Sequence, residues 1–321
     1  MEMNGALKTT VIYSIAILST WLVGCTSYTK THVIKWSGVF MVDSVTAGAV
    51  RLEYHQETSN NNTYAGGRTY DINQRLYFYN FKSDSLYLFS TLNNNLSGIP
   101  FSISYFKDID FNYPMLMYIT TLNGNTITSV YNIETKEFVF STPFRGFLSS
   151  SSKYLVGVKQ VMNLSTKDTS RVENTANDNM FYFNDTTEMG YGIASSLRNP
   201  PFPIYKYGLS GVLPESLGVI NIFDVFGRSP LNKGLIIRLL DPASLRLLNL
   251  DSLKNKSIIS ELVSSDDAFV NADGFDYSKH SGNFVLFKNV GQGGSETGVF
   301  VGNLNDKISM KNISPTIYED D

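Results

Sequence analysis

The sequence contains few of the residue types from which metal and redox sites are built. Among its 321 residues there is one cysteine, Cys25, and three histidines, His32, His55 and His280. A single thiol cannot form a disulfide within the chain or supply a thiolate metal site. None of the histidines has a second histidine two or four residues away, so there is no linear metal-binding pair. We therefore expect no bound metal and no cofactor.

The sequence also lacks the signatures of several other functional classes. Charged residues make up only 17% of the chain and the net charge is −3, so we expect no nucleic-acid partner. No Gly-x-Ser-x-Gly elbow occurs that would place a catalytic serine. Beyond the first 24 residues no apolar run approaches eighteen residues, so we expect no membrane-spanning helix in the remainder. Catalysis has no local support, and whether the protein is an enzyme stays open, with a non-enzyme favoured.

The N-terminal segment is the most informative part of the sequence. Lys8 precedes an uncharged stretch of about sixteen residues, Thr9 to Gly24, which is shorter than the roughly twenty that a spanning helix needs. The stretch ends in Leu22-Val23-Gly24-Cys25. These four residues resemble the lipobox of bacterial lipoprotein signal peptides. The alternative is an uncleaved anchor helix with an incidental cysteine.

The resemblance implies a location and a domain division. Residues 1–24 would be a signal peptide that is removed, and Cys25 would become the mature N-terminus, with palmitate-like acyl chains that hold the protein on a membrane of the bacterial cell envelope. Thr26 follows the cysteine, where lipoproteins retained at the inner membrane often carry Asp, so the outer membrane is favoured in a Gram-negative host. Residues 25–32 would form a tether, and 33–321 a single domain.

Short strand patterns fill the rest of the chain. Residues 50–56 alternate apolar and polar side chains, which is typical of a half-buried strand. Residues 75–81 and 86–91 flank a polar turn, and 115–121 and 126–133 flank Asn123-Gly124, a strong hairpin signal. The remaining strands are expected at 154–161, 179–183, 219–223, 235–240, 245–250, 284–288 and 298–304. This density of strands and turns predicts an all-β fold.

A weak internal repeat indicates how the strands are arranged. Asn80, Asn132, Asn249 and Asn303 each stand between apolar residues before a polar turn, although Gly302 weakens the last example. Their separations are 52 (132 − 80) and 54 (303 − 249) residues, each about one unit, and 117 (249 − 132) residues, which is roughly two units. A unit of about fifty residues divides about 296 (321 − 25) residues into roughly six blades of a β-propeller. Five to seven blades are possible, and β-sandwich domains are the alternative. The pattern loosely resembles the six-bladed, TolB-like propellers of exported bacterial proteins.

One long segment fits the repeat poorly. Residues 163–211 contain an Asn-rich run and Pro200-Pro201-Phe202-Pro203, which disfavour regular structure. We expect an elaborated loop there, since binding residues often lie on long loops of a rigid scaffold. Aromatic side chains in or beside it could stack on a glycan or anchor a protein. These ligand-binding candidates are Tyr191, Phe202, Tyr205 and Tyr207. The alternative is that they cover the core.

Two functional classes follow. The first is a membrane-anchored binding or scaffolding propeller that presents one face to a protein or glycan. The second is an exported carbohydrate-active hydrolase or lyase whose acidic residues meet at the central channel of the propeller. The sequence has three acidic clusters: Asp108 with Asp110, the group Asp266, Asp267, Asp273 and Asp276, and Glu319-Asp320-Asp321, which we interpret as a solvated tail. Carboxylates that converge in a deep pocket would favour the enzyme, and a shallow face lined with aromatic residues would favour binding.

Overall fold

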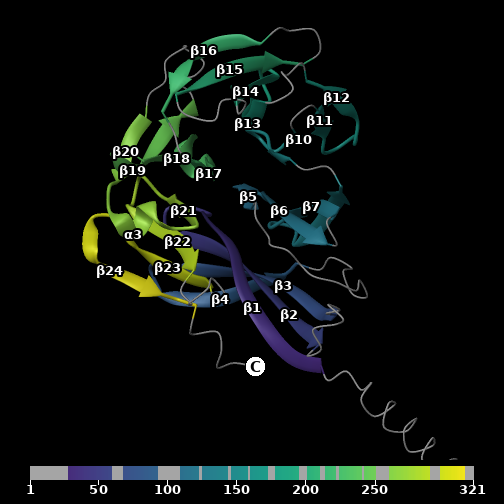
Figure 1. Ribbon diagram of the computed structural model, residues 1–321, viewed down its shortest axis with the longest axis vertical. Helices are drawn as coiled ribbons and strands as arrows, with labels where there is room; N and C mark the ends of the chain where they lie inside the picture. The colour runs from purple at the N-terminus through teal and green to yellow at the C-terminus, as the bar shows by residue number, and fades with distance from the viewer. Residues whose placement is uncertain are drawn as a thin grey trace, which may run out of the picture.

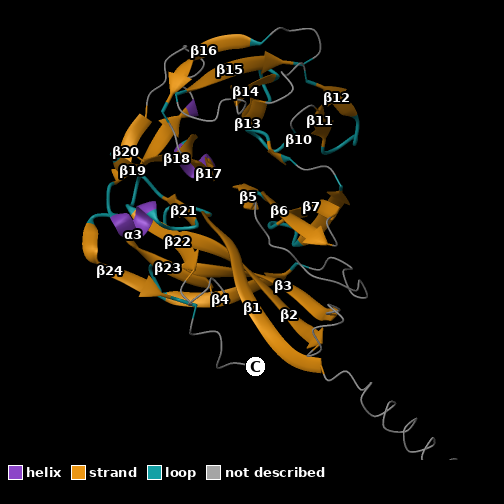
Figure 2. Ribbon diagram, viewed as in Figure 1, coloured by secondary structure: helices purple, strands orange, loops and turns teal. Residues whose placement is uncertain are grey.

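The computed structural model forms a ring of six antiparallel four-stranded sheets, and Figures 1 and 2 show almost no helix between them. The structure describes residues 28–59, 68–92, 109–122, 125–143, 146–157, 160–172, 178–194, 201–209, 214–221, 224–240, 242–250, 260–289 and 297–314. Within each sheet the strands follow chain order from the centre of the ring to its rim. The predicted all-β, six-bladed β-propeller is confirmed, and the alternative of β-sandwich domains is wrong.

Each blade is one continuous stretch of chain. Blade 1 contains β1 (Tyr28–Met41), β2 (Thr46–Ser59), β3 (Arg68–Asn80) and β4 (Ser85–Thr91). Blade 2 contains β5 (Ile109–Asn112), β6 (Met115–Leu122), β7 (Asn125–Asn132) and β8 (Glu137–Thr142). Blade 3 contains β9 (Phe147–Leu148), β10 (Tyr154–Val156), β11 (Gln160–Asn163) and β12 (Thr169–Arg171).

The second half of the ring has the same plan. Blade 4 contains β13 (Asp178–Asn184), β14 (Met189–Ala194), β15 (Phe202–Gly208) and β16 (Glu215–Ile220). Blade 5 contains β17 (Asp224–Ser229), β18 (Gly234–Leu240), β19 (Ala243–Asn249) and β20 (Ser260–Ser264), with a 3₁₀ turn at Pro230–Asn232. Blade 6 contains the one-turn helix α3 (Asp267–Val270), then β21 (Gly274–Tyr277), β22 (Asn283–Asn289), β23 (Thr297–Asn303) and β24 (Asp306–Asn312).

The hydrophobic core lies between the blades. Side chains alternate along each strand, so one blade contributes to the cluster on either side of it. In β18, Leu235 and Ile237 pack towards blade 4, whereas Ile236 packs towards blade 6. Six such clusters separate neighbouring blades around the ring. Both faces of the middle strands are buried, which explains why they read as nearly continuous apolar runs.

The predicted asparagine repeat marks the same structural position in several blades. Asn80, Asn132, Asn249 and Asn303 each end the third strand of a blade. The side-chain oxygen of Asn132 accepts the backbone N–H groups of the next turn at 2.9 and 3.2 Å, and Asn80 does the same at 2.9 and 3.1 Å. Asn163 ends the third strand of blade 3 and accepts the same two hydrogen bonds. The repeat did not predict it, because blade 3 is short and Asn163 follows Asn132 by only 31 (163 − 132) residues.

Blades 1 and 6 close the ring without exchanging a strand. Trp36 and Tyr77 of blade 1 pack with Val285 and Val299 of blade 6 in one buried cluster. The backbone carbonyl of Ser44 accepts hydrogen bonds from the side chains of Ser281 (2.6 Å) and Asn283 (2.9 Å). Among the described residues, each hydrogen bond across this seam involves at least one side chain.

Four predictions about local structure need correction. Residues 163–211 are not one elaborated loop, because β12, β13, β14 and β15 lie within them. Phe202 begins β15, so the proline-rich run ends at the start of a strand, where proline is tolerated. The expected strand 154–161 is a hairpin of β10 and β11, and 219–223 extends past the end of blade 4. The first strand begins at Tyr28, so residues 28–32 of the expected tether pair with β2.

Candidate functional site

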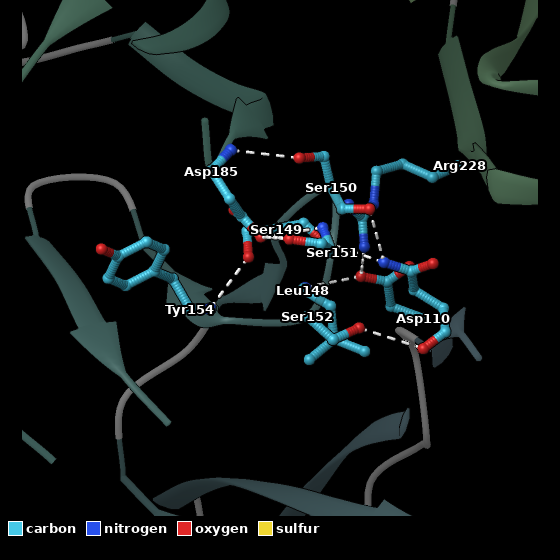
Figure 3. A network of polar contacts seen from close by, with 10 residues as sticks. Asp110, Leu148, Ser149, Ser150, Ser151, Ser152, Tyr154, Asp185 and Arg228 are labelled. Atoms are coloured by element: carbon cyan, nitrogen blue, oxygen red, sulfur yellow. Dashed lines mark hydrogen bonds and ion pairs between the residues drawn. The ribbon is translucent and has the colours of Figure 1, made fainter. Parts of the chain in front are cut away.

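The central axis of the ring carries a network of buried polar contacts (Figure 3). It starts at Asp110 on the inner strand β5 of blade 2, whose side chain is only about a tenth exposed. The Asp110 carboxylate accepts the backbone N–H of Leu148 in blade 3 at 2.7 Å. This bond joins two neighbouring blades at their inner edges, where the chain would otherwise leave an N–H group unpaired.

The second partner of Asp110 comes from the opposite side of the ring. Arg228, in β17 of blade 5, donates from its guanidinium group to the same carboxylate. The Arg228 guanidinium also lies over the ring of Phe147 in blade 3, 5.0 Å from its centroid, in a cation–π geometry. Because β5 and β17 belong to opposite blades, this ion pair bridges the central axis. Both side chains of this ion pair are buried, so replacing either one with a neutral residue would leave the charge of the other without compensation.

Asp276 occupies the corresponding position on β21 of blade 6. One oxygen of its carboxylate accepts the backbone N–H of Met41 in blade 1 at 2.7 Å. The other accepts the hydroxyl of Ser229 (2.5 Å) and the N–H of Tyr277 (2.8 Å). No cation contacts Asp276 within the described residues, and burial raises the pKa of its carboxyl group to about 6, against the opposing effect of these hydrogen bonds.

A serine-rich turn between β9 and β10 of blade 3 forms hydrogen bonds with blade 4. The backbone N–H of Ser151 donates to Asp185 at 2.8 Å, and its hydroxyl group donates to the same carboxylate. The side-chain amide of Asn112, from blade 2, donates to the carbonyls of Ser149 (3.0 Å) and Ser150 (2.9 Å). Figure 3 shows a chain of hydrogen bonds that runs from Asp110 through the serine turn to Asp185. Side chains thus connect all three blades.

This arrangement is suited to holding blades together. The Asp110 and Asp276 carboxylates accept hydrogen bonds from backbone N–H groups, a hydroxyl or a guanidinium. Within the described residues no three His, Cys, Asp or Glu side chains cluster in a way that could hold a metal ion. No helix of the described part is long and apolar enough to cross a membrane. Asp108 and Cys25 lie outside the described residues.

The four predicted aromatic ligand-binding residues belong to the interblade core. Tyr191 is 2% exposed and packs between blades 4 and 5, and Tyr207 is fully buried between blades 3 and 4. Phe202 and Tyr205 are half-buried against the same two clusters. Their side chains fill the spaces between blades, so the structure contradicts the expectation that they stand exposed on a loop.

Exposed apolar side chains occur singly in several blades, and two pairs of them lie on the outermost strands of blades 1 and 2. Tyr87 and Leu88 lie on β4 and are 45% and 49% exposed, and Phe138 and Val139 lie on β8 and are 42% and 37% exposed. The two strands belong to adjoining blades: Lys136, in the turn before β8, places its Nζ 4.7 Å from the ring centroid of Phe89 on β4. We call Tyr87, Leu88, Phe138 and Val139 the rim patch. The sequence did not predict the rim patch, because the outermost strands contain about as many apolar residues as the buried strands do.

The sheet order defines the class of protein, a six-bladed β-propeller. The chain is similar to TolB from Acinetobacter baumannii, at 12% identity and a TM-score of 0.41 over 89% of this chain and 80% of that one. It is also similar to an oligogalacturonate lyase from Vibrio parahaemolyticus (10% identity, TM-score 0.41, 86% and 91% covered). The propeller domain of the Trilobed protease from Pyrococcus furiosus gives 10% identity and a TM-score of 0.42, with 87% and 97% covered. No protein-family model and no curated protein sequence matches the chain.

Proposed function

We propose that the protein is an exported lipoprotein, anchored to a membrane of the bacterial cell envelope through acyl chains on Cys25, whose propeller binds a partner molecule. The lipobox residues support the anchor, and the outer membrane is favoured in a Gram-negative host. Of the two partner classes expected from the sequence, a protein or a glycan, the structure favours a protein.

The rim patch is the observation that carries this preference. It combines two aromatic and two aliphatic side chains, all more than a third exposed. Aliphatic side chains give little to a glycan, whereas exposed apolar groups, aromatic ones above all, are typical of protein interfaces. β4 and β8 are also edge strands, so each presents backbone groups that a partner strand can pair with.

The alternative is a carbohydrate-active hydrolase or lyase with acidic residues at the channel. That function needs carboxylates that are free to act on a substrate. Asp110 and Asp276 are instead bound to neighbouring blades, and Asp110 is additionally paired with Arg228. These contacts support binding over catalysis at the channel.

The anchor is tested by replacing the cysteine. The Cys25→Ala protein should lose labelling by a clickable palmitate analogue and should move from the membrane fraction to the soluble fraction. Retention of the label, or of membrane attachment equal to that of the wild type, would contradict the lipoprotein assignment.

Partner binding is tested by photo-crosslinking in the host envelope. A photoreactive amino acid at Tyr87 or Phe138 should capture a discrete protein, identified by mass spectrometry. The matched controls are Val219 on β16 and Leu262 on β20, which are 59% and 58% exposed and also lie on outer strands. Tyr87→Asp should abolish capture from Phe138, because both residues lie on the side of their strands that faces the boundary of blades 1 and 2, while Leu262→Asp should not. Equal capture at all four positions would show that the rim patch has no special role.

A further inference from the structure

Blade 1 differs from the other five blades in the length of its strands. β1 and β2 have 14 residues each and β3 has 13, whereas β4 has seven and pairs only with Arg75–Asn80. Residues 28–35, 52–59 and 68–74 therefore continue past the fourth strand as a three-stranded ribbon. In Figure 1 this ribbon projects from the ring at lower right, and β1 starts at its outer tip. Blade 4, with β13 to β16, lies at the opposite side of the ring.

The root of the ribbon is held by a network of ion pairs centred on the buried side chains of Arg51 and Glu53. Arg51 is 1% exposed and donates to Glu53 at 3.2 Å and to the hydroxyl of Tyr77 at 3.3 Å. The same Glu53 carboxylate contacts Arg75 (3.6 Å) and His32 (2.8 Å). These residues come from all three ribbon strands. Contacts among buried charged groups are geometrically demanding, so the network fixes the direction in which the ribbon leaves the ring.

The outer half of the ribbon is polar on all three strands. It contains Tyr28-Thr29-Lys30-Thr31, Gln56-Glu57-Thr58-Ser59 and Arg68-Thr69. The strand register places Lys30, Glu57 and Arg68 in one row, with the acidic residue in the middle. The sequence of this half of the ribbon is therefore mostly polar, a composition that suits exposure to water.

We propose that this ribbon is a spacer that holds the propeller away from the membrane in a fixed orientation, with blade 1 nearest to the lipid headgroups and blade 4 farthest from them. The inference rests on the proposed acylation of Cys25. Only Thr26 and Ser27 separate Cys25 from β1, so the ribbon tip stays within about 10 Å of the anchor. The eight residues 28–35 then extend for about 27 Å. The rim patch, on blades 1 and 2, is thereby presented at a defined height.

The spacer is tested by energy transfer in proteoliposomes that contain the intact acylated protein and an acceptor dye on the lipid headgroups. Acylation blocks the only native thiol, so one introduced cysteine carries the donor. The three sites are Ser59→Cys at the ribbon tip, Asn73→Cys near its root and Ser216→Cys on β16 of blade 4. Transfer efficiency should fall in that order. Twenty Gly/Ser residues inserted between Ser27 and Tyr28 should bring the three efficiencies close together.

The possible results separate the two proposals. If the wild-type protein carries no acyl group, the anchor is wrong and the spacer with it. If the protein is acylated but Ser59 and Ser216 give equal efficiencies, or the insertion leaves the gradient unchanged, the spacer alone is overturned. Hydrogen exchange of the same protein in detergent gives an independent result. Amides of residues 52–57, on the central ribbon strand, should exchange slowly, and exchange as fast as in an unfolded peptide would exclude a rigid spacer.

Discussion

Asp110 and Asp276 occupy equivalent positions in blades 2 and 6 but differ in their surroundings. Each lies on the inner strand and accepts a backbone N–H from the next blade around the ring at 2.7 Å. Asp110 is also paired with Arg228 from the opposite blade, whereas Asp276 has only neutral donors, among them Ser229. The shared bond shows how one carboxylate joins two blades. The second partner differs in charge: it is a cation for Asp110 and a neutral hydroxyl for Asp276, and burial raises the pKa of the Asp276 carboxyl group.

The largest effect is expected from removing the paired carboxylate. Asp110→Ala should lower the free energy of unfolding by about 3–5 kcal/mol, because it leaves the Arg228 guanidinium buried without a counter-charge. Urea unfolding followed by circular dichroism measures the change. The control is the double variant Asp110→Asn with Arg228→Met, which removes both charges and should be more stable than Asp110→Ala. If the two proteins unfold at the same urea concentration, the ion pair contributes nothing to joining the opposite blades.

The second prediction concerns Asp276, which should make the free energy of unfolding depend on pH. The pKa of Asp276 is about 6 in the folded protein, against about 4 for an ordinary aspartate. Between these values the folded protein binds a proton that the unfolded chain does not, so the free energy of unfolding falls as pH rises from about 4 to 6 and then levels off. A difference of about 2 pKa units corresponds to about 3 kcal/mol.

The matched variant for this measurement is Asp276→Asn. It removes the titrating group and keeps an amide oxygen that can accept one of the hydrogen bonds. Because other carboxylates titrate in the same range, the quantity to compare is the difference in unfolding free energy between wild type and variant at pH 4.5 and at pH 7.5. This difference should shift in favour of the variant at the higher pH. A constant difference would contradict the raised pKa.

Replacing a turn asparagine should have the smallest effect on stability, with which the effects of replacing Asp110 and Asp276 can be compared. Asn132→Ala removes two hydrogen bonds to exposed backbone N–H groups, of 2.9 and 3.2 Å, that water can replace. We expect a loss of about 1 kcal/mol, seen as a small decrease in Tm. Asn132→Asp keeps the acceptor oxygen and should restore most of the loss. An effect as large as that of Asp110→Ala would mean that turns, and not the central contacts, hold the blades.

Local patterns predicted the fold better than they predicted the site. The asparagine turns at Asn80 and Asn132 recur because each third strand needs the same turn, and that repetition was enough to indicate propeller blades. The ion pair of Asp110 and Arg228 spans 118 residues of sequence, so no local pattern connects its partners. Tyr191 and Tyr207 were misplaced for a related reason. Aromatic residues beside prolines have the same sequence pattern whether they face a neighbouring blade or solvent.

The closure between blades 1 and 6 has a consequence for how the chain can be rearranged. No strand crosses this seam, so each of the six sheets is encoded by its own uninterrupted segment. The linear order of those segments is therefore not essential to the ring. New termini cut between two other blades, with the original ends joined by a linker, would leave every sheet whole. We therefore expect a circularly permuted protein to form the same six sheets.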